Sequence, residues 1–233
     1  MHSITNDPEQ SVTKVTEHLA RVRQRLSEAA LTAHRNPEEI RLLAVSKGQS
    51  VAKIRAAYQA GQRSFGENYL QEAEKKIDAI RETDIEWHFI GRLQSNKARR
   101  VAQLFAWVHT LDRAKLAEKL AAHRPHYAPP LNICLQVSLA GESQKGGIEP
   151  DGVRQLAGKI NTLPQLALRG LMTIPPAVMD PQQNAEYFRR LANLQRSLID
   201  EGYQLDTLSM GMSGRRTARY KGNRLRARAG SYG

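Results

Sequence analysis

The stretch Leu42-Leu43-Ala44-Val45-Ser46-Lys47 decides the fold. Four consecutive apolar residues, one of them β-branched, are typical of a strand that is buried on both faces of a parallel sheet. The lysine that ends the run is expected to place its amine at the rim of an apolar interior, where desolvation favours the neutral, nucleophilic form. The alternative is a strand-end lysine that reaches back into water, which is the commoner case for an arbitrary strand.

Strand and helix patterns alternate along the chain. Strands are predicted at 42–45, 64–66, 86–90, 107–110, 131–137, 166–172 and 207–209, and helices at 12–33, 51–60, 69–80, 97–104, 113–123, 150–163 and 184–201. Such crossovers imply a parallel sheet with helices outside it, and no Gly-rich fingerprint favours a dinucleotide-binding fold. We predict an α/β fold, a TIM-type (β/α)8 barrel with an extra N-terminal helix and an eighth strand that is poorly specified or missing.

Composition narrows the class of protein. The 233 residues, 40% hydrophobic and 25% charged, suit one globular barrel. No apolar stretch approaches the roughly 20 residues of a membrane span, and the first residues lack the layout of a secretory signal. The single cysteine, Cys134, has no disulfide partner, and the histidines show no zinc-site spacing. We therefore expect a cytoplasmic protein with no membrane partner and no metal site.

The net charge of +12 is concentrated at the C-terminus. Residues 214–233 contain seven of the cations and no acidic residue, and without these cations the net charge is +5. Seven cations can attract a phosphate backbone, yet the segment contains no recognised nucleic-acid-binding module. A solvated tail outside the fold is the commoner structure for such a charge run. We therefore do not expect nucleic acid as a partner.

Five segments carry a resemblance to a known family. They are Ala44-Val45-Ser46-Lys47, Phe65-Gly66-Glu67-Asn68-Tyr69, residues 87–97 (WHFIGRLQSNK), Arg169-Gly170-Leu171-Met172 and Leu208-Ser209-Met210-Gly211-Met212-Ser213. Over residues 12–213 the sequence resembles the pyridoxal phosphate homeostasis proteins, which are single-domain relatives of the alanine racemase N-terminal barrel. We accordingly expect a pyridoxal-phosphate-binding barrel over residues 1–213 and an atypical basic tail over residues 214–233.

The resemblance implies that Lys47 holds pyridoxal 5′-phosphate as a Schiff base, since an unprotonated amine attacks an aldehyde. It places Asn68 near the cofactor ring, and Gly211, Met212 and Ser213 in a turn whose N–H groups and hydroxyl serve the phosphate. Without the resemblance, Asn68 would be a helix cap and His88 a packed strand histidine.

The C-terminal segment departs from the family, whose members normally carry an acidic helix and then an eighth strand with Arg-Ile-Gly-Thr. In the corresponding register this chain has Arg228-Ala229-Gly230-Ser231, inside an arginine-rich segment. Arg228, Gly230 and Ser231 are therefore either a degenerate phosphate site or a chance match in an altered or frame-shifted terminus. The sequence leaves both interpretations open.

In function, the resemblance implies a monomeric protein that buffers pyridoxal phosphate and delivers it to dependent apoenzymes, without turnover and with no catalytic residue of its own. The alternative is a fold-type III enzyme such as an amino-acid racemase. Racemisation by two bases needs acid/base groups on both faces of the substrate. In alanine racemases the second base comes from a domain beyond the barrel, which we do not expect this chain to supply.

Overall fold

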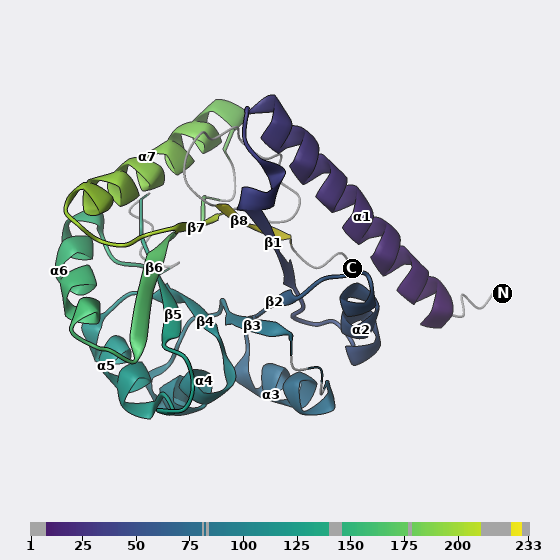
Figure 1. Cartoon of the computed structure of the whole chain (residues 1–233), viewed down its shortest axis with the longest axis horizontal. Coiled ribbons are helices and arrows are strands. Elements are labelled where there is room, and N and C mark those ends of the chain that lie inside the picture. The colour runs from purple at the N-terminus through teal and green to yellow at the C-terminus, as the bar shows by residue number, and fades with distance from the viewer. Residues whose placement is uncertain are drawn as a thin grey trace.

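The structure, a computed structural model, describes residues 8–80, 82, 84–139, 146–176, 179–210 and 225–229. Within these residues a closed barrel of parallel strands follows the order of the chain, with helices around it (Figure 1). The strands are β1 (Ile40–Val45), β2 (Ser64–Glu67), β3 (Glu86–Phe89), β4 (Trp107–Leu111), β5 (Leu131–Gln136), β6 (Leu166–Met172), β7 (Thr207–Met210) and β8 (Leu225–Ala229). The predicted barrel is confirmed.

The helices also follow the predicted pattern. They are α1 (Pro8–Thr32), α2 (Val51–Gln59), α3 (Leu70–Ala79), α4 (Ala98–Leu104), α5 (Ala114–His123), α6 (Pro150–Asn161) and α7 (Pro181–Asp200), with short 3-10 turns η1 (Pro37–Glu39) and η2 (Ser95–Lys97). The extra helix α1 lies along the outside of the barrel beside α2, where Arg23 donates to the carbonyl of Ala60 at 2.7 Å (Figure 1). Among the described residues, no helix has the length and apolarity that a membrane span requires.

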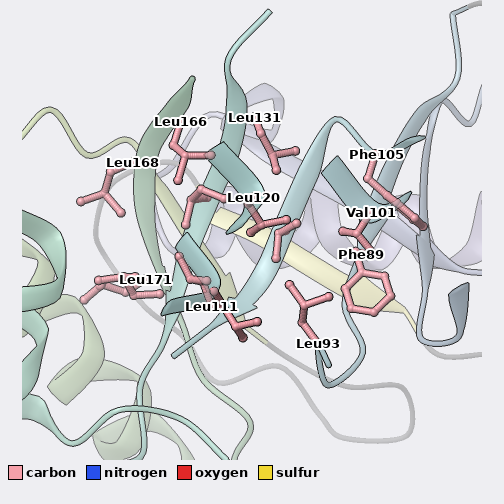
Figure 2. Packing of buried hydrophobic residues seen from close by; sticks show 14 of the residues in the cluster. Phe89, Leu93, Val101, Phe105, Leu111, Leu120, Leu131, Leu166, Leu168 and Leu171 are labelled. Atoms are coloured by element: carbon pink, nitrogen blue, oxygen red, sulfur yellow. The ribbon is translucent and has the colours of Figure 1, made fainter. Parts of the chain in front are cut away.

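The main hydrophobic core lies between the outer face of the barrel and the helices. Strand residues such as Phe89 and Leu168 share this buried cluster with helix residues such as Val101 and Leu120, and Figure 2 shows part of their packing. The rings of Phe89 and Phe105 meet edge to face, with centroids 5.4 Å apart. Because strand side chains alternate, the residues between these core positions face the barrel interior.

Strand β8 closes the barrel between β7 and β1. It pairs with β1 over five residues, from Leu225 opposite Ile40 to Ala229 opposite Ala44, and with β7 over three residues. The expectation of a solvated tail is therefore wrong for Leu225–Ala229, and the eighth strand that the sequence allowed to be missing is present. The physical reason is that backbone N–H and C=O groups pair whatever the side chains, so an arginine-rich composition does not prevent strand formation.

We predict that removing residues 225–233 destabilises the barrel, because it leaves β1 and β7 with unpaired edges. At a net 0.5–1.5 kcal/mol for each backbone hydrogen bond, the free energy of unfolding should fall by about 3 kcal/mol or more. Urea unfolding followed by circular dichroism measures the change. A chain that lacks only residues 230–233 is the control, and equal stability of the two shortened chains would contradict a closing role for β8.

Candidate functional site

The candidate site lies where the carboxyl ends of β1 and β2 meet at the mouth of the barrel. The register pairs Val45 of β1 with Gly66 of β2, so Lys47 and Asn68 each lie two residues beyond the same paired position. The parallel order of the strands thus brings together two residues from different sequence segments. Of the other predicted cofactor residues, Arg228 lies in β8 opposite Leu43. Those at 211–213, 230 and 231 (Gly211, Met212, Ser213, Gly230 and Ser231) lie outside the described residues.

Lys47 lies in a tight turn, Ser46–Gln49, in which the N–H of Gln49 donates to the carbonyl of Ser46 at 3.0 Å. Gly48 has φ +70°, a conformation that glycine adopts without steric cost. The side chain of Lys47 is exposed, and its amine has no hydrogen-bond or ion-pair partner among the described residues. The predicted burial of this amine at an apolar rim is therefore wrong, because the turn carries it beyond the end of the strand.

Behind this turn lies a buried ion cluster of Glu67, Lys76 and Glu72, called here the Glu67–Lys76–Glu72 cluster. The amine of Lys76, on α3, donates to Glu67 Oε1 at 2.7 Å and to Glu72 Oε1 at 2.6 Å. It also donates to the carbonyl of Ser46 at 2.5 Å, and the Ser46 hydroxyl donates to Glu67 Oε1 at 2.6 Å. The cluster therefore contacts the backbone directly before Lys47.

The two carboxylates of the cluster have opposite pKa shifts. Burial raises the pKa of Glu67 above its usual range and outweighs the hydrogen bonds from Lys76 and Ser46, which lower it. Burial also acts to raise the pKa of Glu72, but hydrogen bonds from Lys76 and from the N–H of Gly48 outweigh it, so that this pKa is lowered. Glu72 is thus the carboxylate whose charge the structure stabilises.

Asn68 is half-buried, and its Oδ1 atom is buried without a hydrogen-bond partner among the residues that the structure describes. It is not the cap of α3, as the sequence suggested, because the N-cap of that helix is Tyr69. A Cβ atom at Gly91 would lie 1.9 Å from the carbonyl oxygen of Asn68, so only glycine fits at this position. The glycine of the 87–97 motif therefore allows β3 to approach the Asn68 backbone. Asn68 thus offers an acceptor with unused hydrogen-bonding capacity at the position after β2 that corresponds to Lys47 after β1.

A chain of polar side chains runs through the barrel interior. His88 Nδ1 lies 2.9 Å from His109 Nε2, and His109 Nδ1 lies 2.7 Å from the hydroxyl of Ser209. At the other end, His88 Nε2 lies 3.1 Å from Glu86 Oε2. One arrangement of protons satisfies all three contacts: the serine hydroxyl donates to His109, and each neutral histidine donates onward from Nε2. The chain connects the amino end of β3 to β7, just before Gly211.

The sequence did not reveal this polar chain. The available signal was in β3, where the polar residues Glu86 and His88 are two apart and therefore share one face of the strand. Arg169, from the fourth family segment, lies at the opposite end of the barrel from Lys47. Its guanidinium contacts Asp206 and the side chain of Asn132, and it stacks on Trp107 with 5.4 Å to the ring centroid. In the described part of the chain, no cluster of His, Cys, Asp or Glu could hold a metal ion.

We predict that His88 and His109 are energetically coupled. Replacing either one by Phe should lower the free energy of unfolding by about 1–3 kcal/mol, because the other imidazole keeps a buried nitrogen without its partner. The double replacement should cost less than the sum of the single ones by about 1 kcal/mol. Urea denaturation of the four proteins measures this coupling, and strict additivity would show that the contact contributes nothing.

Comparison with known proteins is consistent with this geometry. Residues 15–232 match the family described as alanine racemase, N-terminal domain. The pyridoxal phosphate homeostasis protein of Pseudomonas aeruginosa is 47% identical over 199 residues, which cover 85% of each chain. Its counterpart in Escherichia coli K12 is 45% identical over 202 residues, which cover 85% of this chain and 86% of the relative.

A solved structure agrees with these sequence matches. PipY of Synechococcus elongatus, determined with pyridoxal phosphate bound, is 33% identical and has a TM-score of 0.81. The superposition covers 93% of this chain and 97% of PipY. The similarity therefore extends over nearly the whole of both barrels.

Proposed function

Because the chain belongs to the family of pyridoxal phosphate homeostasis proteins, built on the alanine racemase N-terminal domain, we propose that it binds pyridoxal 5′-phosphate and takes part in homeostasis of this cofactor. It would buffer the cofactor in the cytoplasm and deliver it to dependent apoenzymes. The name of its relatives and the cofactor bound to PipY support this function.

The observation that carries the proposal is the Lys47 amine at the barrel mouth, which has no partner among the described residues, together with the unused acceptor of Asn68 at the matching position after β2. These two groups fit the cofactor, since an accessible amine can bond to its aldehyde and an amide can contact a polar ring substituent. Lys47 would hold the cofactor through its amine, and the cofactor would supply the aldehyde for this condensation, with water as the by-product.

We assign the phosphate to residues at the ends of the last two strands, on the resemblance alone. Gly211, Met212 and Ser213 directly follow β7, and backbone N–H groups with a hydroxyl are suitable donors to a dianion. Arg228 belongs to β8, which lies between β7 and β1, and Gly230 and Ser231 follow this strand. The position of β8 supports the interpretation of Arg228, Gly230 and Ser231 as a phosphate site in register, over a chance match.

The first prediction of this proposal concerns Lys47. Borohydride reduction of the loaded protein, followed by peptide mass mapping, should place the pyridoxyl group on Lys47. Lys47→Ala should lose both the label and the visible absorption band of the Schiff base. Lys53→Ala is the matched control, because Lys53 also lies near the turn, where its amine donates a hydrogen bond to Gln49 Oε1 at 3.0 Å. Unchanged labelling of the Lys47→Ala protein would contradict the assignment.

The second prediction is that the loaded protein does not racemise amino acids beyond the rate of free pyridoxal phosphate. Two-base racemisation needs a proton donor and a proton acceptor on opposite faces of the substrate. Among the residues assigned to the cofactor, Lys47 is the one that readily exchanges a proton, since the Arg228 guanidinium stays protonated and the Asn68 amide does not titrate. Polarimetry of L-alanine tests this. Turnover that disappears in Lys47→Ala would favour the racemase instead.

A further inference from the structure

The Glu67–Lys76–Glu72 cluster has a role beyond stability. We propose that Lys76 and Glu72 are positioning residues for Lys47, which hold the Ser46–Gln49 turn so that the Lys47 amine is presented to the cofactor aldehyde. This inference rests on the proposed function, because the position of the amine matters only if the cofactor bonds to it.

The contacts of Lys76 are the first observation. An ammonium group has three N–H donors, and here all three are used, on Ser46, Glu67 and Glu72. These acceptors lie at the end of β1, in β2 and on α3, so a single side chain joins three separate elements. The side chain of Lys76 is 6% exposed and that of Glu67 is fully buried. Contacts with so little access to water are held in one geometry.

The second observation is that the cluster forms hydrogen bonds with the backbone on both sides of Lys47. Before Lys47, the Ser46 carbonyl accepts from Lys76, and the Ser46 hydroxyl donates to Glu67. After Lys47, the N–H of Gly48 donates to Glu72 Oε1 at 2.5 Å. The peptide units that flank Lys47 are therefore fixed to one rigid group, while the Lys47 amine has no partner among the described residues. Only the side-chain torsions of Lys47 remain to be ordered on bonding, which is preorganisation of a nucleophile.

Stability alone does not account for such a cluster. Burying charged groups costs free energy, and well-packed apolar residues often replace a buried ion cluster without loss of stability. Within the described part of the chain, the second oxygen of Glu67, Oε2, is buried without a hydrogen-bond partner, which adds to the cost. The Glu67–Lys76–Glu72 cluster costs stability but holds the turn that carries the proposed nucleophile. Positioning of Lys47 therefore explains the presence of the cluster.

Positioning predicts a specific pattern of lost affinity. If the cluster only places Lys47, its removal weakens the bond to the aldehyde and leaves the contacts with the ring and phosphate intact. Pyridoxine 5′-phosphate has an alcohol in place of the aldehyde, so it reports those other contacts alone. In variants of the cluster, the affinity for pyridoxal phosphate should therefore fall, while the affinity for pyridoxine phosphate should stay the same.

The test uses Glu72→Ala, because the Glu72 side chain is 31% exposed and water can reach the place that it leaves. It also uses Lys76→Met combined with Glu67→Gln, which removes a buried charge together with its partner. Glu74→Ala is the matched control, because Glu74 lies on the same helix and pairs with Arg100 at 2.7 Å, away from the turn. Spectroscopic titration gives the two affinities for each full-length protein, and thermal unfolding checks the fold.

We expect both cluster variants to bind pyridoxal phosphate at least about tenfold more weakly, equivalent to 1.4 kcal/mol, and pyridoxine phosphate with unchanged affinity. Glu74→Ala should leave both affinities unchanged. Equal pyridoxal phosphate affinity in the cluster variants and the parent protein, or parallel losses for the two ligands, would overturn the positioning role. A parent protein that forms no Schiff base, or whose Lys47→Ala variant forms the same one, would instead refute the proposed function and the inference with it.

Discussion

Closure of the barrel is the constraint on which the other features depend. Each strand of a closed barrel is paired on both sides, and here β8 supplies the last pairing, between β7 and β1. Closure gathers the carboxyl ends of all the parallel strands at one rim. That rim carries the turn after β1, Asn68 after β2, and the end of β7 at Met210. The candidate site is thus a consequence of topology before any side chain is considered.

Closure also determines which polar side chains must form hydrogen bonds with one another. The outer face of the barrel packs its apolar residues on the helices, whereas the inner face encloses a narrow space that side chains fill. Polar groups on that inner face need partners from other strands, because an unpaired buried group costs about 1–3 kcal/mol. The contacts of His88 with His109, and of His109 with Ser209, meet this need across the interior.

The sequence predicts elements better than it predicts contacts. Strand β6 begins at Leu166 and ends at Met172, the bounds that the sequence predicted. Helix α7 begins three residues earlier than predicted, because Asp180 forms a capping box and Pro181 suits the first helical position. The bond between His109 and Ser209 joins residues 100 apart in sequence, and no local pattern specifies such a partner. The sequence left strand β8 poorly specified, because its arginines suggested a solvated tail. The strand forms through backbone pairing, which the side chains do not determine.

Lys47 and Lys76 show why residue type alone does not identify the site. The strand-end Lys47 was expected to place its amine at a desolvated apolar rim, yet the buried lysine of this pair is Lys76. All three donors of the Lys76 ammonium are engaged, on Ser46, Glu67 and Glu72, which leaves none for a ligand. Lys47 is exposed and has no partner among the described residues, so its amine is open to a ligand. Hydrogen-bond accounting, more than burial, therefore supports the roles proposed for the two lysines, with Lys47 as the reacting amine and Lys76 as the positioning one.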